Sequence, residues 1–434
     1  MRGIPRRAFL KDSLAGPAAL AAASSSARQV HAAANDQINV ASVGVGGMGT
    51  GHVERLLTRQ DVRIAAVCDI DQAHRERAEQ MVKRARGYSP RSVEDFRRLL
   101  DDQSIDALVI ATPHHWHCPI AIPAMQAGKD VYVEKPASHV FREGRLLIEA
   151  AAKYKRIVQH GTQMRSSEVT KKADQLLKSG VIGAVKMSKA WNCQRHNHRP
   201  PAPNGTPPAG VNYDMWLGPA PKLDFNENHF HGNWAWYRDY GNGDIGNDGI
   251  HDLDLARWGL GVTTHPNRIT AHGSRIDITG EREYPDNMSV SYHYDEGKVL
   301  TYEDRGWTPY GNYGFDSGNA FYGTEGYMIF SRRGYFQVYL GKKDEKGPGM
   351  SGGPGGHPEH MYDFLDCVRS RTQTVAHAEV AHLSCALTHL GEIAYRAGRV
   401  LQFDPAREKF IGDAEADKLL TKEYRQPWVV PDPV

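Results

Sequence analysis

Residues 38–53 read INVASVGVGGMGTGHV, and the fold class follows from this stretch. A short β-branched run leads into a glycine turn of the form G-x-G-x-x-G, and the turn opens a helical pattern. In that context the pattern predicts a dinucleotide site, because the glycines allow a tight turn and close approach of the backbone to a pyrophosphate. We expect the pyrophosphate to rest on exposed N–H groups at the positive end of the helix. The residues predicted to bind it are Gly44, Gly46, Gly47, Met48 and Gly49.

An acidic residue at the end of the next strand, VRIAAVCDID (residues 62–71), indicates which dinucleotide binds. Asp69 follows Gly49 by 69 − 49 = 20 residues. A carboxylate at this position can accept hydrogen bonds from the ribose hydroxyls and would repel a 2′-phosphate. Asp71 adds negative charge. The cofactor is therefore predicted to be NAD, with NADP disfavoured; the alternative is a glycine turn that is only structural.

Strands and helices alternate up to about residue 160, which predicts a doubly wound parallel sheet. After residue 165 the strands alternate polar and apolar residues, as antiparallel strands with one solvated face do. We predict an α/β protein with a Rossmann domain over residues 35–160 and an α+β domain with a large, mainly antiparallel sheet over residues 161–434. The segment KKDEKGPGMSGGPGGHP (342–358) is expected to be a loop.

The composition excludes several classes of protein. The chain carries 53 basic and 51 acidic residues, a formal charge of +2, so neither nucleic acid nor an anionic membrane is indicated as a partner. Five scattered cysteines without a CxxC pair are expected to be buried rather than disulfide-bonded or zinc-binding.

The first 34 residues are interpreted as a leader rather than as part of the fold. Arg6 and Arg7 precede an Ala-rich, weakly apolar run that ends in small residues at 32–34. This pattern is typical of a cleavable twin-arginine export signal, and the run is too short and too interrupted to span a membrane. We therefore expect the protein to be exported to the periplasm; a basic start without a signal is the alternative.

The stretch KDVYVEKPASHV (129–140) ends an apolar strand with Glu134, Lys135 and Pro136. Ligands of a doubly wound sheet lie beyond the carboxyl ends of its strands, so the Lys135 ammonium is expected to face the reactive ring of the cofactor. A lysine there can donate to a substrate oxygen and stabilise charge that develops as hydride moves. Glu134 can reach a ribose hydroxyl or hold the lysine. The alternative is a solvated surface lysine.

Four segments together resemble the Gfo/Idh/MocA family, named for glucose–fructose oxidoreductase and inositol dehydrogenase. They are VGVGGMGTGH, VCDID, ATPHHWHCPIAIPAMQAGKDVYVEKP and GNDGIHDLDLARWGL. The resemblance implies nicotinamide-dependent oxidation of a hydroxyl of a sugar, cyclitol or glycoside. It also implies a large second-domain sheet that often serves as an oligomer interface, so a homodimer or homotetramer is expected.

The resemblance also assigns roles to individual residues. Lys135 takes the place of the lysine in the family's E-K-P turn, and Thr112, Pro113 and His117 fall where a loop lies along the nicotinamide half of the cofactor. His251 matches a histidine that meets the reacting hydroxyl. Four residues before it the family has aspartate, whereas this chain has Asn247, which can position a hydroxyl but cannot take its proton. His251 is therefore our candidate general base, since an imidazole titrates near ~6.5.

The substrate is expected to contact polar and aromatic residues, because aromatic faces suit the C–H faces of sugars. Packing at the domain seam is the alternative for the aromatic residues, and no metal is predicted. The candidates are Gln163, Arg165, Trp236, Tyr237, Arg238 and Asp248.

Three functions remain open from the sequence. The first is an NAD-dependent oxidoreductase that acts on a small carbohydrate and recycles a tightly bound cofactor. The second, implied by related family members, is an NAD-dependent glycosidase that oxidises, eliminates and reduces again. The third is a binding protein that kept the fold without the activity.

Overall fold

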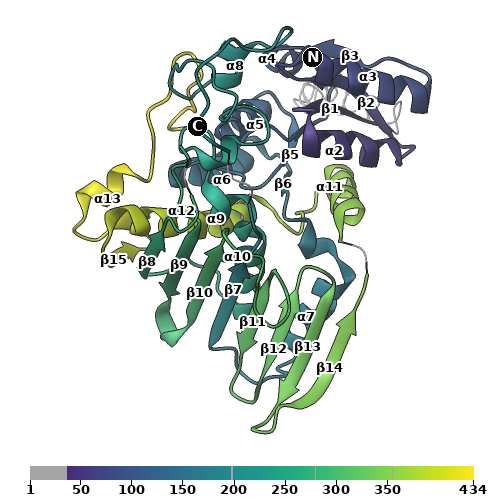
Figure 1. Cartoon of the computed structure of the whole chain (residues 1–434). Helices are drawn as coiled ribbons and strands as arrows, with labels where there is room; N and C mark the ends of the chain where they lie inside the picture. Colours follow the sequence, from purple (N-terminus) through teal and green to yellow (C-terminus); the bar gives the residue numbers. More distant parts are fainter. Residues whose placement is uncertain (1–36, 197–198, 279, 354) are drawn as a thin grey trace, which may run out of the picture.

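The structure, a computed structural model, describes residues 37–196, 199–278, 280–353 and 355–434. The leader predicted at 1–34 lies outside the described residues. Two β-sheets with their helices organise the chain (Figure 1). Within the described ranges, no helix has the length and apolar character needed to cross a bilayer.

The first sheet has six parallel strands in the order β3-β2-β1-β4-β5-β6. The order reverses between β1 and β4, which is where a doubly wound sheet opens a crevice for its ligand. This confirms the predicted Rossmann sheet. Its strands are β1 (Ile38–Val43), β2 (Val62–Cys68), β3 (Arg91–Val93), β4 (Ala107–Ile110), β5 (Asp130–Val133) and β6 (Val158–His160). Its helices are α2 (Gly47–Leu57), α3 (Gln72–Arg86), α4 (Arg97–Leu100), α5 (His117–Gln126) and α6 (Phe141–Tyr154).

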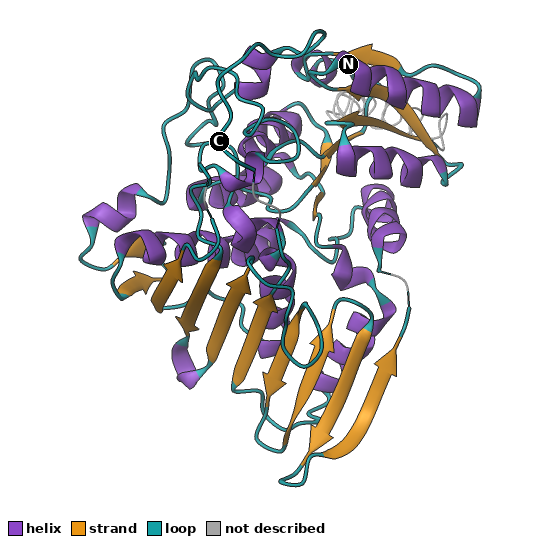
Figure 2. Cartoon of the chain, viewed as in Figure 1, coloured by secondary structure: helices purple, strands orange, loops and turns teal. Residues whose placement is uncertain are grey.

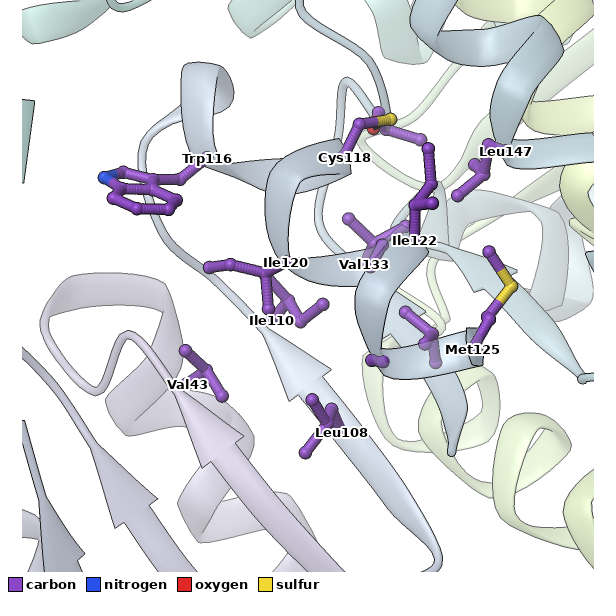
Figure 3. Packing of buried hydrophobic residues seen from close by; sticks show 14 of the residues in the cluster. Val43, Leu108, Ile110, Trp116, Cys118, Ile120, Ile122, Met125, Val133 and Leu147 are labelled. Carbon is purple, nitrogen blue, oxygen red and sulfur yellow. Dashed lines mark hydrogen bonds between the residues drawn. The ribbon is translucent and has the colours of Figure 1, made fainter. Parts of the chain in front are cut away.

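Helix α5 packs its apolar residues onto the first sheet (Figure 3). Ile120 and Ile122 of the helix join Leu108 and Ile110 of β4 in one buried cluster. Such burial is worth about 1.5–3 kcal/mol for each large aliphatic side chain. Trp116, just before α5, belongs to the same cluster and also lines a cavity, so the packing of α5 positions a wall of the candidate site.

The last helices of the chain return to the Rossmann domain. Helix α11 (His357–Ser370) lies beside α2 in Figure 1, and its Phe364 and Leu365 share a buried cluster with Val40 of β1. Helix α12 (Ala378–Ala397) contributes Cys385 to the cluster around α5. Both domains are therefore joined by common cores, which holds the space between them in a defined shape.

The second sheet has ten strands in the order β14-β13-β12-β11-β7-β10-β9-β8-β15-β16. All neighbours are antiparallel except β7 and β10, which confirms the predicted mainly antiparallel sheet. Helices cover one face of it (Figure 2). The strands are β7 (Met187–Asn192), β8 (Arg268–Ser274), β9 (Asn287–His293), β10 (Val299–Arg305), β11 (Ser317–Tyr322), β12 (Gly326–Ser331), β13 (Tyr335–Leu340), β14 (Glu345–Ser351), β15 (Leu401–Asp404) and β16 (Lys409–Phe410). The remaining helices are α7 (Glu168–Lys178), α8 (Tyr213–Leu217), α9 (Gly243–Asn247), α10 (Gly249–Leu260) and α13 (Ala414–Lys418).

Strand alternation behaves as the sequence predicted. In β9, Met288, Val290 and Tyr292 are buried, whereas Ser289 is exposed on the opposite face. The five cysteines are all buried and free, which confirms the reading drawn from their spacing.

One expectation about a loop is wrong. Part of the segment expected to be a loop, residues 345–351, forms strand β14 at the edge of the sheet. Proline has no backbone N–H to donate. An edge strand tolerates Pro348 because its backbone nitrogen can face outward, where no neighbouring strand needs a hydrogen bond from it. The pairing with β13 is irregular between Gln337 and Tyr339, where the Gln337 amide donates to the Gly347 oxygen (2.8 Å).

Candidate active site

The glycine turn after β1 is held by backbone contacts that no larger residue could keep. Gly44 has φ +76°, and a Cβ placed there would lie 2.7 Å from the Ala111 oxygen. A Cβ on Gly49 would overlap the Gly44 carbonyl oxygen, whereas one on Gly47 meets nothing within 4 Å. The turn is therefore closed on the protein side and open at Gly47, at the start of α2, where N–H groups are free to bind an anion.

A cavity of about 450 Å³ runs from this turn to the seam between the domains. It lies at the carboxyl ends of the parallel strands, as the switch of strand order predicts. Its wall combines residues of both domains, among them Gly46, Asp69, Thr112, Lys135 and Asn247.

Asp69 faces the cavity and fixes the turn beside it. Its Oδ2 accepts from the Val45 N–H (2.8 Å), and its Oδ1 accepts from the Asp71 N–H (3.0 Å). The His74 Nδ1 lies 3.3 Å from Oδ2. The carboxylate thus stands at the position where it would meet a ribose and repel a 2′-phosphate.

The Lys135 ammonium spans the seam between the domains. Its Nζ donates to the backbone oxygen of Asn247 (2.6 Å) and to the Oδ1 of the same residue (3.2 Å). Lys135 comes from the end of β5 and Asn247 from the end of α9, so the contact joins residues distant in sequence. A cation is thereby held on the cavity wall, two strands along the sheet from the glycine turn, rather than in bulk solvent.

Glu134 is buried and lines the cavity together with Lys135. Its Oε1 lies 2.9 Å from the His52 Nε2 of α2, and its Oε2 accepts from the Lys135 N–H (3.1 Å). Burial raises its pKa, but the His52 hydrogen bond and nearby positive charges outweigh burial and hold the pKa far below its usual range. Glu134 thus remains a carboxylate that fixes the backbone of Lys135.

The loop after β4 is held by His117. The ring nitrogens of His117 face two carbonyl oxygens, Nδ1 that of Pro136 (2.6 Å) and Nε2 that of Thr112 (2.8 Å). His117 does not line the cavity; it joins the loop to the turn that carries Lys135. Thr112 and Pro113 do line it. The Thr112 Oγ1 is buried with no hydrogen-bond partner among the described residues, so it is available to a bound ligand.

His251 lies at the start of α10, four residues after Asn247, just behind the cavity wall. Burial, followed by the charges of Arg332 and Lys135, lowers its pKa well below the usual value. Its Nδ1 has no partner among the described residues. The imidazole is therefore neutral near neutral pH and can accept a proton.

Two carboxyl groups on either side of His251 differ in charge. Burial would raise the pKa of Asp248, but Arg332 and Lys135 lower it to about 2. Burial raises the pKa of Asp252 to about 8 although the Arg332 Nε lies 3.5 Å from its Oδ2 and lowers it, because neither carboxyl oxygen has a hydrogen-bond partner among the described residues. At neutral pH Asp248 is ionised and Asp252 is protonated.

None of the predicted substrate residues, Asp248 included, lines the cavity. Arg165 is buried and forms a bidentate ion pair with Asp254 (2.7 Å for each bond). Trp236 and Tyr237 belong to a buried aromatic cluster, and Arg238 pairs with Glu392 (3.1 Å). These four side chains are therefore engaged in packing and ion pairs at the seam between the domains, and they do not face the cavity. Gln163 begins a short 3₁₀ turn and also does not line the cavity.

Sequence reasoning missed His114, which lines the cavity between Thr112 and Trp234. Its ring meets the Trp234 ring edge to face at 4.5 Å. The sequence only partly indicated this residue, because ATPHHWH contains three histidines and the prediction assigned the cofactor loop to the third, His117. Which of them faces the cavity depends on the 3₁₀ turn His114–Trp116.

Two groups of side chains in the described part of the chain have the spacing of metal ligands. Asp71, His74 and His231 form one, and His265, His382 and Glu408 form the other. In the second group Glu408 also pairs with Arg145, whose positive charge disfavours a cation. The first group lies at the adenosine end of the cavity, where His231 is 3.1 Å from the Asp71 carboxylate.

The cavity fits NAD on three observations. The open direction at Gly47 leaves room for a pyrophosphate, the Asp69 carboxylate suits an unphosphorylated ribose, and the unpartnered Thr112 hydroxyl lies toward the reaction end. Comparisons with known proteins agree. A profile described as "Oxidoreductase family, NAD-binding Rossmann fold" matches residues 38–162. A second, "Oxidoreductase family, C-terminal alpha/beta domain", matches residues 174–318 and 349–430. The chain belongs to the Gfo/Idh/MocA oxidoreductase family. The predicted family and cofactor are thereby confirmed.

Curated relatives match part of this Gfo/Idh/MocA chain. A "Glycosyl hydrolase family 109 protein 2" of Shewanella sp. (strain ANA-3) is 34% identical over 35% of the chain and 38% of its own length. An "Alpha-N-acetylgalactosaminidase" of Shewanella oneidensis is 28% identical over 37% of the chain and 38% of its own length. The match thus spans well under half of each relative.

Solved structures share the fold over most of the chain. Levoglucosan dehydrogenase, solved with NADH and L-sorbose, has a TM-score of 0.67 at 18% identity, covering 84% of this chain and 98% of its own. The aldose-aldose oxidoreductase of Caulobacter crescentus has a TM-score of 0.64 at 17% identity, covering 85% and 100%. At this identity the likeness shows the architecture of Gfo/Idh/MocA proteins.

Proposed function

We propose that the protein oxidises a hydroxyl of a sugar, cyclitol or glycoside with NAD that stays bound. The observation that carries this proposal is the Lys135 ammonium, held by Asn247 in the cavity wall three strands along the sheet from Asp69. Bound NAD supplies the hydride acceptor. Lys135 donates to the substrate oxygen, and the neutral imidazole of His251 accepts the hydroxyl proton.

The adenosine end of the cavity supports retention of the cofactor. A second-domain segment crosses this end, where Gln72 N–H donates to the Gly210 oxygen (3.0 Å) and Asn212 N–H donates to the Ile70 oxygen (3.1 Å). His231 of the same region pairs with Asp71. Release of NAD then requires these contacts to open, which suits an exported enzyme that recycles its cofactor.

The experiment is to purify the full chain and to follow absorbance at 340 nm as a panel of sugars and glycosides is added. We expect nicotinamide in the purified protein and its reduction by at least one carbohydrate. His251→Gln should lower that rate by about 10²–10⁴-fold, the usual contribution of a general base. A protein that holds no nicotinamide and cannot take it up contradicts the proposal.

A second function, glycoside cleavage by transient oxidation, is favoured by the names of the curated relatives. Asn247 in place of an acid is consistent with it. A product assay separates the two functions. Release of an aglycone without net NADH supports the glycosidase, and accumulation of a keto-sugar supports the dehydrogenase.

We also propose that the chain forms a homodimer or homotetramer through the open face of the large sheet. On neighbouring strands of that sheet, Tyr327 stacks with Tyr339 (4.8 Å, 16°) and lies 6.2 Å from Tyr322. Aromatic rows on a half-exposed face are typical of interfaces. Light scattering during gel filtration tests this, and a monomer at every concentration contradicts it.

Export through the twin-arginine route remains our proposal for residues 1–34. It rests on Arg6, Arg7 and the small-residue run before residue 35. Replacement of both arginines by lysine should retain the protein in the cytoplasm of an expression host. Periplasmic recovery of that variant in normal amounts contradicts the proposal.

A further inference from the structure

We propose that His114 is a second proton-transfer residue, which removes the proton from the substrate carbon next to the newly formed carbonyl group. The inference rests on the proposed function, because that carbon–hydrogen bond is acidic only after the hydroxyl has been oxidised. It also adds something that oxidation alone does not need. Oxidation of one hydroxyl releases one proton, for which His251 suffices.

A hydrogen-bond chain fixes the tautomer of His114. The Asn242 Nδ2 donates to the His139 backbone oxygen (2.8 Å), which orients the amide and leaves Oδ1 as an acceptor. The His114 Nδ1 lies 3.0 Å from that Oδ1 and so carries the proton. The lone pair is then on Nε2, which has no hydrogen-bond partner among the described residues.

The position of His114 suits this role. The residue lines the cavity at the reaction end, with Trp234 against its ring and the Lys135 charge among its neighbours. Burial, followed by the charges of His117 and Lys135, lowers its pKa well below the usual value. It belongs to the Rossmann domain, whereas His251 belongs to the second domain, so the two bases approach the site from different domains.

The proposed step balances without a further reagent. The carbon–hydrogen bond breaks, its proton forms a bond with the His114 Nε2, and its electron pair shifts toward the carbonyl carbon. The carbonyl oxygen becomes an enolate oxygen, to which Lys135 donates. The proton can return to the same carbon. If an alkoxy group lies on the next carbon, the electron pair can instead expel it, and the proton goes to the leaving oxygen.

The test is deuterium incorporation in D₂O, with the carbohydrate of the 340 nm panel that reduces NAD fastest; the panel includes levoglucosan and p-nitrophenyl α-N-acetylgalactosaminide. Wild-type protein should place deuterium on the carbon next to the oxidised one, as seen by NMR and mass spectrometry of the recovered sugar. NAD reduction in a single turnover is measured on the same His114→Gln protein, and its deuterium incorporation should fall by about 10²-fold or more relative to that reduction rate. His272→Gln, at an exposed histidine of β8, is the matched control and should behave as wild type.

The positioning role of Asn242 gives a second measurement. Asn242→Asp keeps an acceptor for the His114 Nδ1–H and should retain incorporation, whereas Asn242→Ala should lower it by about 10-fold. If His114→Gln fails to fold by thermal melting, His114→Asn takes its place in the same assay.

The outcomes separate the two proposals. If no member of the panel reduces NAD, the result counts against the proposed function and, with it, against the role of His114. Reduction without deuterium incorporation in wild type overturns the role of His114 alone. Wild-type incorporation by His114→Gln also overturns it, and so does equal loss of NAD reduction and incorporation in a folded variant.

Discussion

The two ends of the cavity are built in different ways. The glycine-turn end comes from one continuous stretch, residues 44–69, and depends on backbone contacts that exclude a Cβ at Gly44 and Gly49. The reaction end joins Thr112 and His114, Lys135, Asn247 and His251 from separate parts of the chain. Close backbone contacts therefore shape the glycine-turn end, which binds the cofactor. Opposing charges and burial set the chemistry of the reaction end.

The comparison is sharpest at Lys135. Lys135→Met removes the ammonium that the two Asn247 oxygens hold at the reaction end, and it leaves the glycine turn intact. We therefore expect kcat to fall by about 10²–10³-fold or more. The Kd of NAD, followed by fluorescence, should change by less than about 10-fold. Lys189→Met is the control, because Lys189 pairs with Glu303 (2.8 Å) on the large sheet. Parallel loss of NAD binding would break the distinction between the two ends.

The turn end gives the converse experiment. A methyl group on Gly49 overlaps the Gly44 oxygen, so Gly49→Ala should weaken NAD binding by about 10²-fold and lower the free energy of unfolding by about 1–3 kcal/mol. Gly47→Ala meets open space and should leave the free energy of unfolding within about 0.5 kcal/mol of wild type. Calorimetric titration and urea unfolding check both variants. Equal destabilisation by the two would show that the turn is not held by these backbone contacts.

The sequence predicted the glycine-turn end more completely than the reaction end, because the first comes from one continuous stretch and the second from separate parts of the chain. Glycine spacing and Asp69 are local signals, and their geometry follows from a strand, a turn and a helix. The strand-end position of Lys135 was also accessible from the pattern. His114 and Arg332 were not, because their roles depend on a 3₁₀ turn and on a strand end brought beside α10 by the fold. Arg165 and Trp236 have suitable chemistry, but the fold buries them in an ion pair and an aromatic cluster.

Charge at the reaction end should be visible in the pH dependence of stability. Asp252 is fully buried with a pKa of about 8, whereas an unfolded aspartate titrates near about 4, so the folded state binds the extra proton between these values. The contribution of protonated Asp252 to the free energy of unfolding is therefore present at low pH and is lost as the pH rises toward 8. The free energy of unfolding falls by at most about 1.4 kcal/mol per pH unit in this range.

Asp252→Asn removes this titration. Relative to wild type, its free energy of unfolding should rise by about 1–3 kcal/mol between pH 5 and pH 8, measured by urea unfolding at each pH. Asp224→Asn, at an exposed aspartate, should show no such trend. A difference between Asp252→Asn and wild type that does not change with pH would mean that Asp252 is already ionised in the folded protein.

The smallest effect is expected where this chain departs from the family's aspartate. The Lys135 Nζ is held mainly by the Asn247 backbone oxygen (2.6 Å), and the side-chain oxygen is farther away (3.2 Å). Asn247→Asp preserves both acceptors, and its added negative charge lies next to Asp248, whose pKa is already lowered to about 2. We therefore expect kcat/KM to change by less than about 10-fold, or 1.4 kcal/mol in the barrier. A larger change in steady-state assays, with NAD affinity unaltered, would show that the side chain rather than the backbone positions the lysine, and the reaction end would then depend on the residue at position 247 as strictly as the turn depends on Gly49.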